Sequence, residues 1–283
     1  MIKLDLSSFL LQWAAGGLLF TWITTRLRMV SLGYGWVNRA LYGLMALGAA
    51  IVGFRGDTVW VRDLSAAAVA LATAVAFVES YVRRHAGVSG QRALAEARTE
   101  RVAVMTGIDR EAQDKGSGPE FRPQLDLVAP VLALPGLVAA GISAGDPAWL
   151  SVARLIVGAV FLGAVSDAML LGHWYLVQPG LGRGPLLDLV KWTGGLWPIE
   201  VALLLVPTGM VSVLNGTIDD GYNGLLGWFW VASAVFTGVL IFVTWLALKE
   251  RYYSAVMAAT GLLYLAILTA FGTDLVARAV LAG

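Results

Sequence analysis

Eight long apolar runs dominate the sequence and restrict what this chain can fold into. They cover residues 8–25, 34–54, 63–82, 127–145, 149–177, 190–213, 223–248 and 253–276. Each run is close to or above the ~20 residues with which a helix crosses a ~30 Å hydrocarbon core. Most runs are apolar on all sides, as lipid-exposed helices are, and they lack the alternation of barrel strands. The sequence therefore predicts an all-α, polytopic integral membrane bundle of about eight transmembrane helices.

The composition supports a membrane location and excludes several kinds of site. Charged residues make up 14% of the 283 residues, whereas soluble domains carry roughly 25%. The chain has no cysteine, which rules out disulfides and thiolate metal sites. Its two histidines, His85 and His173, are too few for an all-protein zinc site. We expect no metal, and at a net charge of +1 we expect no nucleic-acid partner.

Lysine and arginine are distributed unevenly between the two sides that eight spans would define. All but five of the 20 lie on one side, and the exceptions are Lys3, Arg55, Arg62, Arg154 and Arg278. Because cytoplasmic loops are enriched in these residues, the sequence predicts that both termini lie outside (N-out/C-out). The chain is rich in alanine and glycine, which is typical of bacterial membrane proteins, so we expect an integral protein of the plasma (cytoplasmic) membrane.

The chain divides into three parts. Residues 1–82 hold transmembrane helices 1–3, and residues 127–283 hold transmembrane helices 4–8. Between them, residues 83–126 form a cytoplasmic polar loop in which Ser89 begins a short amphipathic helix through Gln91–Met105. This loop is interpreted as a solvated connector near the lipid headgroups. The alternative is a docking surface for a membrane or cytoplasmic protein partner.

The cytoplasmic end of the fifth run gathers a carboxylate, an imidazole, an indole and a phenol, namely Asp167, His173, Trp174 and Tyr175. Imidazole donates or accepts a hydrogen bond near neutral pH, and aromatic side chains pack on a ring while offering a polar group. Met169 and Leu176, four residues before and three after His173, resemble a short pattern described for quinone sites. These residues predict a quinone or lipid headgroup site. An ordinary interfacial aromatic belt is the competing interpretation.

Glu200 is the clearest ionisable residue inside an apolar run, and such residues are costly in a bilayer. It follows Pro198, which frees a backbone carbonyl and kinks a helix. A carboxyl group beside a kink could bind a proton, a cation or an amine, or it could join helices as a structural group. Arg154, near the outer end of the fifth run, is expected to reach the interface by snorkelling. The alternative is an inward orientation toward Glu200.

These observations leave the function open between hypotheses of different classes. The favoured one is a membrane-embedded subunit of a larger, energy-transducing assembly with a quinone or lipid headgroup site at the end of the fifth helix. The alternative is a proton-coupled small-solute transporter that uses Glu200 on a proline-broken sixth helix. A haem held by His85 and His173 is disfavoured because His85 lies outside the hydrocarbon. No catalytic motif is recognisable, so no catalytic residue is predicted and an enzyme is disfavoured.

Overall fold

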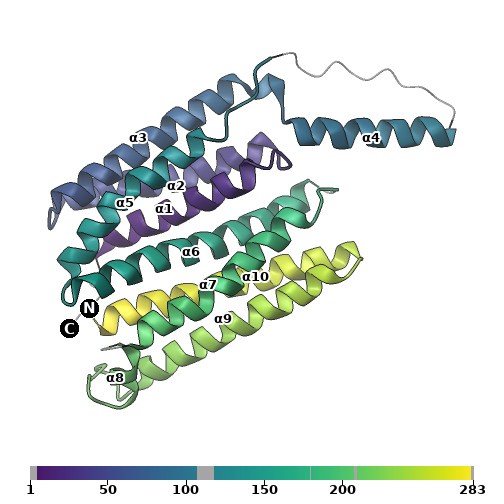
Figure 1. Ribbon diagram of the computed structural model, residues 1–283. Helices are drawn as coiled ribbons and strands as arrows, with labels where there is room; N and C mark the ends of the chain where they lie inside the picture. The colour runs from purple at the N-terminus through teal and green to yellow at the C-terminus, as the bar shows by residue number, and fades with distance from the viewer. Residues whose placement is uncertain (1–4, 107–117, 179, 207–208, 282–283) are drawn as a thin grey trace.

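The computed structural model describes residues 5–106, 118–178, 180–206 and 209–281. Within these ranges the chain is helical and contains no strand, which confirms the predicted all-α class. Figure 1 shows long helices that run side by side. Both termini and α8 (Met210–Leu214) lie at one end of the bundle, the terminus end. The helix α4 (Ser89–Thr106) projects from the opposite end, the α4 end.

The long helices form two neighbouring groups. The first group contains α1 (Leu6–Thr25), α2 (Leu32–Arg55), α3 (Trp60–Val82) and α5 (Leu125–Ala144). The second group contains α6 (Ala148–Val177), α7 (Gly184–Leu205), α9 (Leu225–Lys249) and α10 (Tyr253–Val280). The helix α6 joins them, because it packs against α1 and α5 on one side and against α7 and α10 on the other.

Seven of these helices are long and apolar enough to cross a membrane, namely α1, α2, α3, α5, α6, α9 and α10. The chain is therefore a helical membrane protein. The eighth long helix, α7, has 22 residues, but each stretch of it long enough to span contains Asp188, Lys191 and Glu200. Its length matches the others, and its charge distinguishes it from them.

The sixth predicted run is the one whose boundaries differ most from the structure. Instead of a helix over 190–213, α7 begins at Gly184 and ends at Leu205, and a separate short helix, α8, follows. Pro185 lies in the first turn of α7, where a missing N–H does no harm. Val206 precedes Pro207 and adopts an extended backbone, as residues before proline prefer. The prolines at both ends thus account for the shifted bounds.

The polar loop contains the predicted helix. It is α4, which begins at Ser89 and ends at Thr106, so the expected helix over Gln91–Met105 is confirmed. The part of the loop over 107–117 lies outside the described residues. At the base of α4, Glu120 forms ion pairs with Arg28, at 2.7 Å, and with Arg92. These ion pairs tie the loop to the connection between α1 and α2.

The helices α1 and α6 approach each other closely where glycines lie between them. A Cβ atom added to Gly16 would lie 1.7 Å from the carbonyl oxygen of Ala159, and one added to Gly163 would lie 2.1 Å from the carbonyl carbon of Gly16. Small residues let helix backbones touch in this way inside membranes. The α1–α6 pair therefore forms the centre on which the polar groups described below are arranged.

Candidate functional site

Five buried polar residues from four helices gather near the terminus end, and we call them the charge cluster. They are Gln12 of α1, Arg154 of α6, Glu200 of α7, and Asp274 and Arg278 of α10, each 0–2% exposed. Four of them lie five or six residues inside their helices, which corresponds to about 9 Å at 1.5 Å per residue. Helices that are distant in sequence thus place these polar side chains at a similar distance from the terminus end.

The contacts within the charge cluster link α10 to α1. Arg278 donates from Nε to Oδ2 of Asp274 at 2.7 Å, and from Nη2 to Oε1 of Gln12. Glu200 lies close enough to Asp274, Arg278 and Arg154 to interact electrostatically with each. Two arginines and two carboxyl groups therefore share this site, and its net charge depends on whether Glu200 holds a proton.

Arg154 does not reach the interface, so the snorkelling expected from the sequence is wrong. Its side chain is 1% exposed and donates from Nε to the carbonyl of Leu203 at 2.9 Å and from Nη2 to the carbonyl of Val206 at 3.2 Å. These carbonyls belong to the end of α7, where helical partners for the last carbonyls are missing. Because α7 ends at Leu205 rather than at residue 213, its last carbonyls are free to accept hydrogen bonds from the buried Arg154 side chain.

The charge cluster also holds most of the buried polar atoms that lack a protein hydrogen-bond partner. Among the described residues there are seven such side-chain atoms, and four are Gln12 Nε2, Arg154 Nη1, Glu200 Oε2 and Arg278 Nη1. A buried polar group without a partner costs about 1–3 kcal/mol. Four of the seven unpaired atoms therefore lie within one cluster.

Asp167, which the sequence placed in a headgroup site, faces the middle of the bundle. Its carboxylate accepts hydrogen bonds from Asn38 Nδ2 at 2.9 Å, the Tyr42 hydroxyl at 3.1 Å and the Thr21 hydroxyl at 3.4 Å. Asp167 is fully buried. It therefore joins α6 to α1 and α2, in the direction opposite to Arg154.

The three aromatic residues that follow Asp167 point to different neighbours. His173 is exposed, and its Nδ1 lies 3.1 Å from the hydroxyl of Tyr264 on α10. Trp174 donates to the hydroxyl of Ser31 at 3.0 Å, before the start of α2. Tyr175 is buried and donates to a backbone carbonyl in the connection to α7. The structure does not bring Asp167, His173, Trp174 and Tyr175 together around one space.

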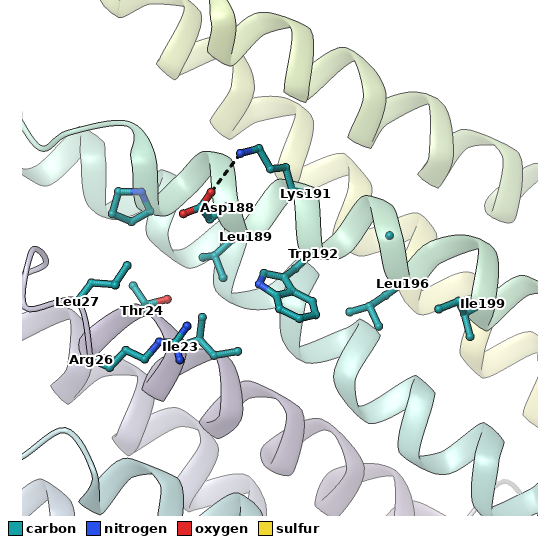
Figure 2. A pocket seen from close by; sticks show the side chains of 12 residues that line it. Ile23, Thr24, Arg26, Leu27, Asp188, Leu189, Lys191, Trp192, Leu196 and Ile199 are labelled. Atoms are coloured by element: carbon teal, nitrogen blue, oxygen red, sulfur yellow. Dashed lines mark hydrogen bonds and ion pairs between the residues drawn. The ribbon is translucent and has the colours of Figure 1, made fainter.

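A second candidate site is a groove between α1 and α7 at the α4 end, which Figure 2 shows from close by. Its volume is about 440 Å³. Charged residues lie at one end of it, where Lys191 pairs with Asp188 at 3.3 Å and Arg26, just past the end of α1, stacks on Trp22 at 4.8 Å. Apolar side chains, among them Trp192 and Ile199, line the rest. A charged end and an apolar wall suit an amphipathic molecule.

The chain is thus a polytopic helical membrane protein with ionisable groups buried between its helices. Comparison with known proteins finds no matching family model, curated protein or solved structure.

Sequence reasoning identified Glu200 and Arg154 but missed the remaining members of the charge cluster. Gln12 is a neutral residue in an apolar run and gives no distinctive signal. Asp274 and Arg278 are four residues apart, a spacing that places them on one helix face. This pair at the end of the last run was the available signal.

Proposed function

We propose that the chain crosses the cytoplasmic membrane of a bacterium eight times, with α7 as the eighth span and both termini outside. Three observations support this topology. The helix α7 runs beside α6 and α9, both termini lie at one end, and α4 lies at the other. The uneven distribution of lysine and arginine then places the α4 end in the cytoplasm.

The absence of cysteine makes this topology directly testable, because an introduced cysteine is the only thiol in the chain. Glu96→Cys on α4 and Asp219→Cys in the α8–α9 connection are to be labelled in intact cells with a membrane-impermeant maleimide. We expect Asp219→Cys to react in intact cells and Glu96→Cys only after permeabilisation. The opposite pattern would reverse the orientation, and labelling of both in intact cells would rule out the eight-span arrangement.

We propose that the protein is a proton-coupled carrier of a small solute, with Glu200 as the proton-exchanging group. The observation that carries the proposal is the charge cluster, in which Glu200 is buried beside two arginines and Oε2 has no protein partner. Ionisable groups inside membranes are costly and mark ion or proton pathways. The helix α7 is continuous through Pro198, so the break expected there from the sequence is wrong, although Pro198 removes one backbone N–H from the helix. The helix ends instead at Leu205, where the carbonyls of Leu203 and Val206 accept hydrogen bonds from Arg154.

Protonation of Glu200 would change how the four helices are held together. Ionised, the carboxylate balances the arginines from α6 and α10. Protonated, it leaves one positive charge unbalanced, so the electrostatic attraction between α7 and its neighbours weakens while Arg278 keeps its ion pair with Asp274. A change of charge at the junction of four helices is a physical basis for two alternative packings.

Reconstitution into liposomes that contain a pH-sensitive dye tests the carrier proposal. We expect inward gradients of the transported solute to move protons with the wild-type protein and not with Glu200→Gln. Glu96→Gln, the same substitution at an exposed position of α4, serves as the matched control and keeps the activity. Proton movement by Glu200→Gln at the wild-type rate would reject Glu200 as the proton-exchanging group. A wild-type protein that is inactive across a broad solute panel would reject the carrier function.

A second candidate function is the membrane-embedded subunit of a larger, energy-transducing assembly that binds a quinone or lipid headgroup. The groove between α1 and α7 favours it, because Arg26 and Lys191 can face an anionic headgroup while Trp192 and Ile199 face its chains. The helix α4, which exposes Val104 and Met105, is a candidate surface for a cytoplasmic protein partner.

Native mass spectrometry and a visible spectrum of gently extracted protein test the assembly. Partner subunits or a retained quinone support it, and Trp192→Ala then reduces the amount of bound lipid or quinone. A colourless monomer without bound lipid or quinone would argue against it.

A further inference from the structure

The unpaired atoms of the charge cluster are mainly hydrogen-bond donors. Gln12 Nε2, Arg154 Nη1 and Arg278 Nη1 can only donate, and Glu200 Oε2 is the one unpaired oxygen among them. All four residues are at most 2% exposed. We propose that the charge cluster binds a small inorganic anion, in competition with the Glu200 carboxylate for the same donors. This inference rests on the proposed carrier function and names its class of substrate.

The geometry around Gly158 shows where the groups converge. The position of a Cβ on Gly158 lies 2.5 Å from Gln12 Nε2 and 3.4 Å from Glu200 Oε1. Gly158 is four residues after Arg154, so both lie on the same face of α6. The missing side chain at Gly158 thus lets the amide of α1 and the carboxyl of α7 meet against the α6 backbone, next to Arg154.

The donor inventory favours an anion over a metal cation. Hard cations such as Ca²⁺ need about six to eight oxygen ligands, and only one of the cluster's four fully buried atoms without a partner is an oxygen, Glu200 Oε2. The nearest other carboxylate, Asp274, already accepts from Arg278 at 2.7 Å. Guanidinium and amide N–H groups are, in contrast, the usual ligands of small anions.

The charges that face Glu200 couple the anion to a proton. They are Arg154 from α6 and Asp274 and Arg278 from α10, whereas α1 contributes the neutral Gln12 and the only ionisable residue of α9, Lys249, is its last. With Glu200 ionised the charges balance, and with Glu200 protonated the cluster has one excess positive charge. One proton and one monovalent anion therefore restore the balance together, and each promotes binding of the other.

Chloride is the probe, with gluconate as the inert comparison, and thermal stability of the detergent-solubilised protein is the readout. We expect chloride to raise the melting temperature of the wild type more at low pH than at high pH. If one proton accompanies each anion, the apparent chloride affinity weakens by up to about tenfold for each unit by which the pH rises. Glu200→Gln, which is permanently neutral, keeps the stabilisation and loses its pH dependence.

A glycine substitution tests the position of the site. Gly158→Ala adds a methyl group 2.5 Å from Gln12 Nε2 and is expected to weaken chloride stabilisation. Gly261→Ala on α10, where an added Cβ meets no atom within 4 Å, is the matched control. Chloride stabilisation that is absent in the wild type at every pH, or equal in Gly158→Ala, would overturn the inference.

The outcomes also separate this inference from the carrier proposal. If chloride stabilises the protein as described but no gradient moves protons, the anion site stands and the carrier falls. If another solute moves protons through Glu200 while chloride has no effect on stability, the carrier stands and the anion site is overturned.

Discussion

The buried ion pair between Arg39 and Asp126 allows a quantitative prediction about stability. Arg39 donates from Nε to Oδ1 of Asp126 at 2.7 Å and from Nη2 to Oδ2 at 2.8 Å, and both side chains are 1% exposed. Arg39 also donates to Ser80 at 3.1 Å and stacks on Phe121 at 4.3 Å. This pair joins α2 to the start of α5 at the α4 end of the bundle.

Removal of one partner from a buried pair leaves an uncompensated charge, which costs about 3–5 kcal/mol. We therefore expect Asp126→Asn and Arg39→Met each to lower the free energy of unfolding by roughly 3 kcal/mol or more. The double variant removes both charges. It should lose less than the sum of the single losses, by roughly 2 kcal/mol, because coupled neighbours are not additive.

Unfolding of the purified protein in mixed micelles, followed by loss of helical circular dichroism, measures these free energies. The Lys191→Met and Asp188→Asn pair is a suitable control, because that ion pair is about 58% exposed, and such pairs contribute 0–1 kcal/mol. Strictly additive losses at Arg39 and Asp126, or a near-neutral Arg39→Met, would show that the two residues do not stabilise the protein as a coupled buried pair.

Further predictions concern packing and one loop. Gly16→Val should destabilise the α1–α6 contact by about 1–3 kcal/mol in the same unfolding assay, because its Cβ would lie 1.7 Å from the Ala159 carbonyl oxygen, whereas Gly48→Ala adds only an ordinary contact at 3.5 Å. Asp220→Ala should increase amide hydrogen exchange at the start of α9, where Asp220 accepts four backbone N–H bonds, and Asp219→Ala should not. Partial desolvation raises the pKa of Asp220, but these four bonds outweigh it and leave the pKa below its usual range. The amide protection should therefore persist at neutral pH and be lost only as the pH falls through that lowered pKa; loss near neutral pH would contradict this account.

The sequence predicted the helices well because apolar run length is a direct physical requirement of the bilayer. The sixth run is the exception, because run length does not register the effect of proline on the backbone. Hydropathy placed one helix over 190–213, but Pro185 and Pro207 act through backbone geometry rather than polarity. They shifted the start of α7 to Gly184 and its end to Leu205.

The candidate site was only partly predictable, because its members come from helices whose packing order the sequence does not contain. Glu200 stood out as a carboxyl group in an apolar run. Arg154 had two orientations open to it, and the decision depended on the carbonyls of Leu203 and Val206, which another helix supplies. His173 and Asp167 are six residues apart in sequence, but in the structure they face α10 and α2 respectively. Residues that are close together along one helix therefore do not share a site here, because their side chains face different helices.

We propose that Glu200 exchanges a proton inside the helical bundle. Infrared difference spectroscopy of protein labelled with carbon-13 at the glutamate side chain, recorded between high and low pH, reads this protonation without a transported solute. We predict the stretching band of a protonated, buried glutamic acid that forms in the wild type and in Glu96→Gln and is absent from Glu200→Gln. The same band in Glu200→Gln, or no pH-dependent band in the wild type, would contradict the claim.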